Sequence, residues 1–364
     1  MLRCGWKRGR TSSPSRPKTC GRGSRPSSRS GRHASRGTEV AMLLRKRAFL
    51  QSALVGLLPT ALPLRPAWAE ATPKRPVQII VAFPPGGPSD AIARSIAPAL
   101  SERWSVPVIV DNRPGAAGSI AAAMVLREAA DGHILLFTAS THVQAIGLKL
   151  RLSYDPVADF QCIIQAAVSP LVFMVRMDGP RTLADFIALA RQRSLSHASF
   201  GVATTGHIYG EYLNQVAGIA MINVPFNGGA PAVSALLGGQ TDCSFIEATQ
   251  AIPLVQSGSL RPLAVTGPTR FTHLPEVPTF VESGLRGFEL RGMHSILARS
   301  AVPDGVADRL AADLGAVMGE KVIAARLAAL GVERPPPTPD RRAALRLEAE
   351  QWTDLIRRTG VSVQ

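Results

Sequence analysis

The sequence predicts an α/β protein built on two sheets, and three observations support this. After Pro76, apolar runs of strand length alternate with longer amphipathic stretches, which is the rhythm of strands and helices in α/β folds. The same rhythm starts again at Leu171, which implies a second sheet. The chain has 364 residues, of which 46% are apolar, and this is enough to fill two modest cores and to exclude wholesale disorder.

The first 41 residues belong to neither sheet. They contain eleven Lys and Arg residues against a single acid, Glu39, and almost no large apolar side chain follows Trp6. Such a composition cannot bury enough apolar surface to offset the entropy of ordering. We therefore expect residues 1–41 to be a basic extension that is either disordered or never translated.

Residues 42–69 have the layout of a secretory signal peptide. A basic stretch precedes the apolar run 48–64, and small residues stand three and one positions before Glu70. We expect cleavage before Glu70, export to the periplasm, and a true translation start at Met42. A membrane anchor is the alternative, but the run is interrupted by prolines and is shorter than the roughly 20 apolar residues of a spanning helix. A twin-arginine export route also stays open.

The positive charge is confined to these two segments. Residues 1–69 hold 15 of the 41 basic residues and one of the 26 acids, which leaves 26 basic and 25 acidic residues in 70–364. The mature chain is nearly neutral, so we expect no nucleic-acid partner. It contains Cys162 and Cys243, for which two buried thiols are favoured over the disulfide that an oxidising compartment would permit.

Each element of the mature chain is predicted from the length and period of its apolar pattern. Short runs rich in Val, Ile and Phe predict strands, and longer stretches with apolar positions three or four apart predict helices. We expect a parallel sheet covered by helices in the first half. Its strands are predicted at 77–83, 106–110 and 134–138, and its helices at 89–104 and 119–130.

The second half repeats the pattern and is followed by a tail without strands. The tail is rich in Ala, Leu, Arg and Glu, and we expect two helices within 306–331 and 341–360, separated by a proline-rich turn at 335–339. The second sheet is predicted to contain strands at 171–175, 198–201, 221–224, 243–246 and 262–265, with helices at 183–193, 208–217 and 231–237.

The chain lacks the signatures of common catalytic sites. No nucleophile elbow, H-E-x-x-H, C-x-x-C, Walker A or complete G-x-G-x-x-G motif is present in the sequence. The histidines of the mature chain do not have the spacing of a metal site. We therefore expect no enzyme activity, no cofactor and no metal, with a secreted α/β enzyme as the weaker alternative.

The strongest local feature is the loop between the first predicted strand and helix. Its two glycines allow backbone conformations closed to other residues, and its prolines stiffen it. We expect Ser89 or Asp90 to cap the helix, whose free N–H groups would then bind an anion without Lys or Arg. Asp90 would repel that anion unless it faces away or meets an ammonium group of the ligand, and a purely structural turn is the alternative. The expected ligand-binding residues here are Phe83, Pro84, Pro85, Gly86, Gly87, Ser89 and Asp90.

Two further junctions between a strand and a helix carry hydroxyl groups. Ser140 and Thr141 follow the strand ending at Thr138, and Thr204 and Thr205 precede a helix in the second half. Each pair could be an ordinary helix cap. Three junctions that are polar, uncharged and rich in donors, spread over both α/β halves, suggest a cleft that holds a carboxylate from both sides.

Several motifs follow one another in the order of a known family. They are RPVQIIV at 75–81, FPPGGPSD at 83–90, DNRPGAAG at 111–118, DGH at 131–133, YDP at 154–156, LGGQTD at 237–242 and LRPLAVT at 260–266. In these motifs the chain resembles the periplasmic solute receptors of tripartite tricarboxylate transport, the Bug family of TctC-like receptors. Matches from Arg75 to Trp352 cover essentially the whole mature chain.

The resemblance implies a type II periplasmic-binding-protein fold, in which two α/β domains are joined by crossing strands and a ligand cleft lies between them. Domain 1 is expected to comprise 70–168 with 292–364, and domain 2 to comprise 169–291. The resemblance further implies a small organic carboxylate as ligand, membrane permease subunits as partners, and a monomer. A receptor that serves a membrane sensor instead of a permease shares all of these features.

Two places depart from the family's usual pattern. The stretch 201–206 is shorter than the Gly-rich loop that relatives carry before the equivalent of His207, which puts ligand contacts from domain 2 in question. Met293 and the pair Ala298-Arg299 stand where relatives tend to have Trp and Ala-Pro. An unusual ligand and a gene under weakened constraint are the two interpretations.

Overall fold

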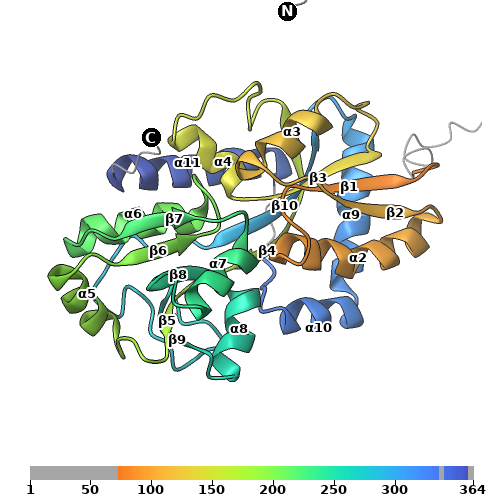
Figure 1. Cartoon of the computed structure of the whole chain (residues 1–364). Helices are drawn as coiled ribbons and strands as arrows, with labels where there is room; N and C mark the ends of the chain where they lie inside the picture. Colours follow the sequence, from red (N-terminus) through yellow and green to blue (C-terminus); the bar gives the residue numbers. More distant parts are fainter. Residues whose placement is uncertain (1–72, 336–339, 360–364) are drawn as a thin grey trace, which may run out of the picture. The chain divides into compact units, whose positions relative to one another are not determined.

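The computed structural model describes residues 73–335 and 340–359 (Figure 1). The expected basic extension at 1–41, the signal peptide at 42–69 and most of the proline-rich turn lie outside these residues. Within the described part, no helix is long and apolar enough to cross a membrane.

Sheet A has five strands in the order β2-β1-β3-β10-β4. The first three are parallel, with Ile79 paired to Val110 on one side and to Leu135 on the other. Strand β10 runs antiparallel to both of its neighbours. The strands are β1 (Val77–Val81), β2 (Val108–Asn112), β3 (Ile134–Ala139), β4 (Phe160–Ser169) and β10 (Gly292–Arg299).

Sheet B repeats this arrangement in the order β7-β6-β8-β5-β9. Strands β6, β7 and β8 are parallel, and β5 runs antiparallel between β8 and β9. The strands are β5 (Leu171–Arg176), β6 (Ser196–Ser199), β7 (Ile222–Pro225), β8 (Cys243–Glu247) and β9 (Leu260–Val265).

The predicted parallel sheet is confirmed for β1, β2 and β3, but the strands that join the two sheets run antiparallel to their neighbours. Only Pro170 separates β4 from β5, so no crossover helix can reverse the chain and β5 enters sheet B directly. Strand β10 re-enters sheet A after the irregular segment 266–291 and pairs with β4 over its whole length. Neither β4 nor β10 was predicted from the apolar pattern alone.

Helices cover both sheets, and most lie where the apolar period predicts them. Two short helices, α4 and α8, were not predicted, and the tail holds three helices because Glu320 is extended between α9 and α10. The helices are α2 (Pro88–Trp104), α3 (Ser119–Val125), α4 (Thr141–Gly147), α5 (Leu183–Gln192), α6 (Thr205–Ala217), α7 (Gly229–Leu237), α8 (Ala248–Gln256), α9 (Asp304–Gly319), α10 (Lys321–Ala329) and α11 (Arg341–Thr359), with a 3-10 turn η2 (Ala116–Gly118) before α3.

Sheet A is buried on both faces, which explains the nearly continuous apolar run of β1. Ile79 packs in the cluster that contains α2 and α9, whereas Ile80 packs in the cluster on the opposite face. The buried carboxylate of Asp313 on α9 accepts hydrogen bonds from Arg103 Nε at 2.6 Å and Trp104 Nε1 at 2.9 Å. These bonds hold the end of α2 against α9.

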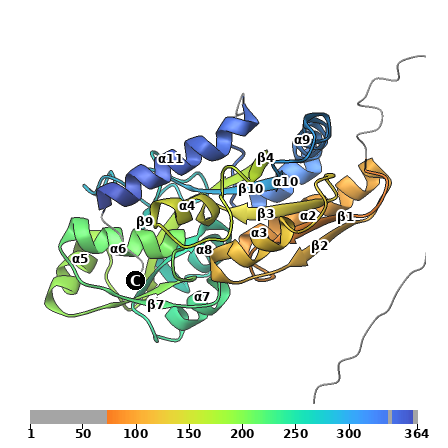
Figure 2. The same cartoon turned by 90° about the horizontal axis from the view of Figure 1, so that it is seen from above.

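Helix α11 belongs to the tail but contacts elements of both halves. It packs on β4 and α4, and it also reaches α6, as Figure 2 shows. The ring of Trp352 on α11 lies 5.8 Å from the ring of Tyr209 on α6. The C-terminal helix therefore helps to position the second half against sheet A.

Cys162 and Cys243, the cysteines of the described residues, are free and buried, as the sequence favoured. Cys162 lies in β4 of sheet A, and Cys243 begins β8 of sheet B. Burial is the main reason that the pKa of Cys162 is raised to about 12 and that of Cys243 is raised as well. Both thiols therefore stay protonated and unreactive at neutral pH.

Candidate ligand-binding site

Five helices begin around one small chamber at the carboxyl ends of the parallel strands. Helices α2 and α4 follow β1 and β3 of sheet A, and α6, α7 and α8 follow β6, β7 and β8 of sheet B. The chamber has a volume of about 70 Å³, room for a few water-sized groups. Its walls are Phe83, Pro84, Pro85, Gly87, Pro88, Ser89, Ala139, Thr141, Phe200, Thr205, Asn227, Gly228, Gly229, Ala230, Pro231, Glu247 and Gln250.

This convergence brings the positive ends of several helix dipoles to the chamber without a cationic side chain. The first turn of a helix has N–H groups without intrahelical acceptors, and its end of the dipole is positive. Among the described residues that line the chamber there is no Lys, Arg or His. An anionic group placed beside these first turns would be held mainly by backbone N–H groups.

The loop before α2 is fixed by Asp90, which does not face the ligand space. Its carboxylate accepts a hydrogen bond from Gly86 N–H at 2.9 Å and another from Arg94 Nε at 2.8 Å. Burial raises the pKa of Asp90, but the bonds from Arg94 and Gly86 outweigh it and the pKa is lowered overall. The prediction that Ser89 or Asp90 caps α2 is wrong, because Gly87 is the capping residue and Pro88 follows it.

Ser89 lines the chamber and connects it to sheet A. Its hydroxyl lies 3.1 Å from Nδ1 of His294, a buried residue of β10. On the other side of the imidazole ring, Nε2 lies 3.4 Å from Oε2 of Glu247, where sheet B ends. One ring therefore bridges the first turn of α2 and the first turn of α8.

Ser140 and Thr141 are neighbours in sequence but have different surroundings. The Ser140 hydroxyl donates to the buried carboxyl of Glu348 on α11 at 2.6 Å and accepts from Met293 N–H at 2.9 Å. Ser140 does not line the chamber. Thr141 does, and its buried hydroxyl has no hydrogen-bond partner in the described part of the chain.

Thr204 and Thr205 are also neighbours of which only one lines the chamber. The Thr204 hydroxyl donates to Gly201 O at 2.7 Å, and this residue lines an outer cleft rather than the chamber. Thr205 lines the chamber, where its hydroxyl accepts a bond of 2.9 Å from Gln144 Nε2 on α4. This bond joins α6 to α4 across the chamber.

Two junctions of sheet B were missed by sequence reasoning. The segment FNGGAP at 226–231 before α7 has nearly the same composition as FPPGGP at 83–88, and this likeness was the available signal. Gly228 has φ +109°, and a Cβ there would lie 3.0 Å from Pro84 Cγ on the other side of the chamber. No feature of the sequence marked Glu247 as a wall residue. It reaches the chamber because β8, the strand that it ends, lies in the middle of sheet B.

The structure therefore divides the expected ligand-binding residues into two groups. The first group lines the chamber: Phe83, Pro84, Pro85, Gly87, Ser89, Thr141 and Thr205. The second group stands behind its walls or beside it: Gly86, Asp90, Ser140 and Thr204. The members of the second group have the hydrogen-bonding roles within the protein described above.

An outer cleft adjoins the chamber and shares Phe83, Pro84, Phe200, Asn227 and Gly228 with it. Its volume is about 670 Å³, and it extends along the loops at 114–119, 150–152 and 200–204. Access from this side would bring a small molecule to the first turns of α2 and α7.

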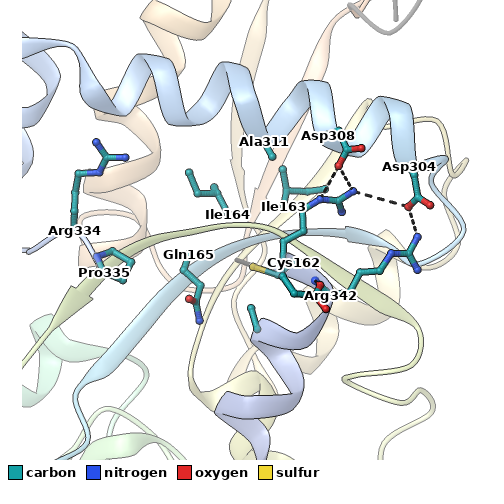
Figure 3. A pocket seen from close by; sticks show the side chains of 13 residues that line it. Cys162, Ile163, Ile164, Gln165, Asp304, Asp308, Ala311, Arg334, Pro335 and Arg342 are labelled. Atoms are coloured by element: carbon teal, nitrogen blue, oxygen red, sulfur yellow. Dashed lines mark hydrogen bonds and ion pairs between the residues drawn. The ribbon is translucent and has the colours of Figure 1, made fainter. Parts of the chain in front are cut away.

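A second groove lies between α9 and the start of α11, away from the chamber (Figure 3). Its volume is about 640 Å³, and four of its charged groups are paired: Arg341 lies 2.6 Å from Asp308, and Arg342 pairs with Asp304. The groove is bordered by Pro335 and Asp340, on either side of residues that the structure does not describe. We assign it no function. No group of side chains within 73–335 and 340–359 could hold a metal ion.

Comparison with known proteins decides the family. Residues 92–361 match the family described as the tripartite tricarboxylate transporter family receptor, TctC. The chain belongs to the TctC family. It is 30% identical over 322 residues to BugT of Bordetella pertussis, which covers 86% of this chain and 98% of BugT. A protein from the tcbD-tcbE intergenic region of Pseudomonas sp. strain P51 is 33% identical over 329 residues, covering 89% of this chain and 97% of that protein.

Solved TctC-family structures share the fold. The periplasmic binding protein BugD is 30% identical with a TM-score of 0.75, covering 80% of this chain and 100% of BugD. An R. palustris protein solved with adipate gives the same identity and TM-score, covering 80% of this chain and 99% of the other. MatC from Rhodopseudomonas palustris, with bound malate, is 27% identical with a TM-score of 0.71, covering 78% and 99%. TctC proteins are solute-binding receptors and not enzymes, so the Bug-family resemblance, the two-domain fold and the expected lack of enzyme activity are confirmed.

Proposed function

We propose that this TctC receptor captures a small organic carboxylate in the chamber and delivers it to the membrane permease subunits of a tripartite transporter. The receptor is exported by the signal peptide at 42–69, works in the periplasm as a monomer, and needs neither a cofactor nor nucleic acid. Solved relatives contain adipate and malate, which supports a carboxylate as the ligand class.

The convergence of five helix N-termini on the chamber is the observation that carries this proposal. A carboxylate there would accept hydrogen bonds from backbone N–H groups of Ser89 and of the first turn of α7, as well as from the unpaired hydroxyl of Thr141. Phe83 and Phe200 would cover the carbon skeleton. A ligand held mainly by the backbone also explains why the sequence has no cationic motif.

We further propose that domain 1 comprises 70–168 with 292–364 and domain 2 comprises 169–291. The strand assignment supports this division, since sheet A contains β1–β4 and β10 while sheet B contains β5–β9. The two domains meet around the chamber, through the Thr205–Gln144 bond and the contact of Gly228 with Pro84. A ligand that bridges them would favour the closed arrangement.

Binding without turnover is the decisive measurement. The receptor, purified from periplasm after expression of the full chain, would be screened by thermal shift against mono-, di- and tricarboxylates, and positive compounds titrated by calorimetry. We expect stabilisation and saturable binding by at least one carboxylate, which is recovered chemically unchanged. If no carboxylate binds, or if a bound acid is converted, the receptor function is wrong for this chain.

The same preparation tests the export proposal. Its intact mass should correspond to a chain that begins at Glu70. A periplasmic form that retains residues before position 68 would contradict the signal peptide, and material found only in the cytoplasm would contradict the location.

A further inference from the structure

Glu247 brings the chamber its only ionisable side chain among the described wall residues. It is the last residue of β8 and stands immediately before α8. Its Oε2 atom is buried and has no hydrogen-bond partner in the described part of the chain, and Nε2 of His294 lies 3.4 Å from it. A carboxylate in this position faces the same space in which the helix N-termini would hold the acid group of a ligand.

Two fixed features of opposite character therefore share one chamber. The first turns of α2 and α7 favour a negative group, whereas Glu247 disfavours one and favours a cation. The second carboxylate of a simple diacid would meet Glu247 at the cost of like-charge repulsion. An ammonium group would instead form a charge-assisted hydrogen bond with the carboxylate of Glu247.

Thr141 supplies an independent sign that the chamber holds a polar ligand. Its side chain is 3% exposed, and its hydroxyl has no partner in the described part of the chain. A buried hydroxyl without a partner is unfavourable unless a ligand or water satisfies it. Thr141 lies on the sheet A side, so it can serve the acid end of a ligand while Glu247 serves the other end.

We propose that the ligand of this receptor carries an amino group as well as a carboxylate, with its ammonium group bound by Glu247. This inference rests on the proposed function and specifies its substrate class: amino acids or other short amino carboxylates. The imidazole ring of His294 lies between the hydroxyl of Ser89 and Oε2 of Glu247, so it links the acid-binding start of α2 to Glu247. His294 borders Glu247 from behind the wall, so the open side of the carboxylate remains for the ligand.

The test compares ligands that differ only by an amino group. Calorimetric titrations would use three pairs: succinate and aspartate, glutarate and glutamate, butyrate and 4-aminobutyrate. We expect the amino member of at least one pair to bind about tenfold to a hundredfold more tightly, the value of one hydrogen bond to a charged group. Glu247→Gln keeps the shape of the side chain and should reduce this ratio to about twofold or less.

Two control variants make the result specific. Glu247→Asp retains the charge and should retain the preference for the amino compound. Glu102→Gln removes one negative charge from an exposed position of α2 and should leave the ratio unchanged. Thermal midpoints without ligand show that the variants are folded, and the wild-type ratio decides the question even if Glu247→Gln is unstable.

The outcomes separate the two proposals. If the wild type binds the deamino acids as tightly as the amino compounds, or if Glu247→Gln keeps the full preference, the role of Glu247 is overturned while the receptor function stands. If no member of any pair and no acid of the carboxylate screen binds, the receptor function itself is overturned.

Discussion

The junctions β3–α4 and β8–α8 occupy equivalent places in two sheets of the same strand order, yet they bring opposite chemistry to the chamber. In sheet A the junction presents the neutral hydroxyl of Thr141, with Ser140 turned back to Glu348. In sheet B it presents the carboxylate of Glu247. The repeated topology places a helix N-terminus at each site, but the residue at each junction sets which ligand group is favoured.

The two glycine-containing loops also differ in what holds them. The loop before α2 is fixed within domain 1 by the bonds from Gly86 and Arg94 to Asp90. The loop before α7 is placed by close approach, with Gly228 against Pro84 of the other domain and Gly229 against Gln250. The sheet A wall is therefore held by bonds within its own loop, whereas the sheet B wall also depends on the close approach of Gly228 to Pro84.

Gly228→Ala should have the largest effect on affinity, because it changes the place where the loop before α7 approaches Pro84. Gly228 has φ +109°, a conformation that only glycine adopts readily, and the added methyl group would lie 3.0 Å from Pro84 Cγ. We expect carboxylate affinity to fall by about a hundredfold because the methyl group hinders closure of the chamber, whereas about 1–3 kcal/mol of backbone strain lowers stability. Calorimetry of both proteins measures the loss.

Gly218→Ala is the matched control for this substitution. Gly218 also has a positive φ, +61°, but it ends α6 and no atom lies within 4 Å of the added Cβ. It should lower stability without changing affinity. Equal losses of affinity in the two variants would mean that the Gly228 loop acts through folding rather than through domain closure.

The fold could be predicted where the sequence of an element has a clear apolar period of its own. The strands and helices with a clear apolar period, such as β1 and α2, lie close to their predicted limits. The antiparallel strands β5 and β10 could not be assigned a direction, since direction depends on where the chain crosses between sheets. Helices α4 and α8 were missed because each has only seven to nine residues and follows a strand without a loop.

Glu348→Gln should have the next largest effect, on stability, and probes the support behind the sheet A wall. Burial raises the pKa of Glu348 to about 7, against smaller lowering contributions from Ser140 and His294. Because this pKa is raised above its unfolded value near 4.5, the contribution of Glu348 to stability is complete below pH 4.5 and is lost as pH rises through about 7. At pH 8 the variant should be more stable than the wild type by on the order of 2 to 3 kcal/mol, and at pH 5 nearly equal.

Denaturant unfolding at pH 5, 6.5 and 8 checks this difference. The buried His142 and His197 have pKa values lowered to about 4 and about 3, so they stabilise the fold above pH 6.5 and cease to do so in acid. Their contribution is the same in both proteins and cancels. Glu350→Gln, an exposed neighbour on α11, should show no pH-dependent difference. A constant difference between wild type and Glu348→Gln would show that Glu348 is charged throughout.

The candidate site was only partly accessible to sequence reasoning, and the residue pairs show why. A hydroxyl at a junction predicts a donor, but only the three-dimensional structure reveals whether that donor is already used. Ser140 and Thr204 are used within the protein, whereas Thr141 has no partner. Asp90 posed the same problem, and its partner Arg94 lies one turn along α2. Thr205 reaches the chamber but also bonds to Gln144, a contact between distant segments.

Thr141→Val should produce a smaller effect, on affinity rather than on stability. The substitution keeps the shape of the side chain and removes a buried hydroxyl that has no partner in the described part of the chain. We expect ligand affinity to fall by about threefold to tenfold, the value of one neutral hydrogen bond. The free energy of unfolding without ligand should stay the same or rise by up to about 1 kcal/mol.

Ser140→Ala should lower stability and leave affinity unchanged, the reverse of Thr141→Val. The two variants together compare the hydroxyls of two neighbouring residues. It leaves Glu348 without its hydroxyl donor and Met293 N–H without its acceptor. Stability should fall by about 1–3 kcal/mol, while affinity measured on the folded protein stays within about twofold. Loss of affinity in Ser140→Ala with none in Thr141→Val would reverse the assignment of the two hydroxyls.

Thr204→Ala should have the smallest effect on binding, and it tests whether the short 201–206 segment reaches the ligand. The Thr204 hydroxyl donates to Gly201 O at 2.7 Å and does not cap α6 with its side chain. The neighbouring Ala203 N–H is likewise used, by Nδ1 of His207 at 3.1 Å. Because these donors are satisfied within the loop, affinity should change by less than about twofold while stability falls by roughly 0.5–1.5 kcal/mol. A tenfold loss of affinity at unchanged stability would instead bring this loop into the chamber wall and make domain 2 a direct source of hydroxyl donors.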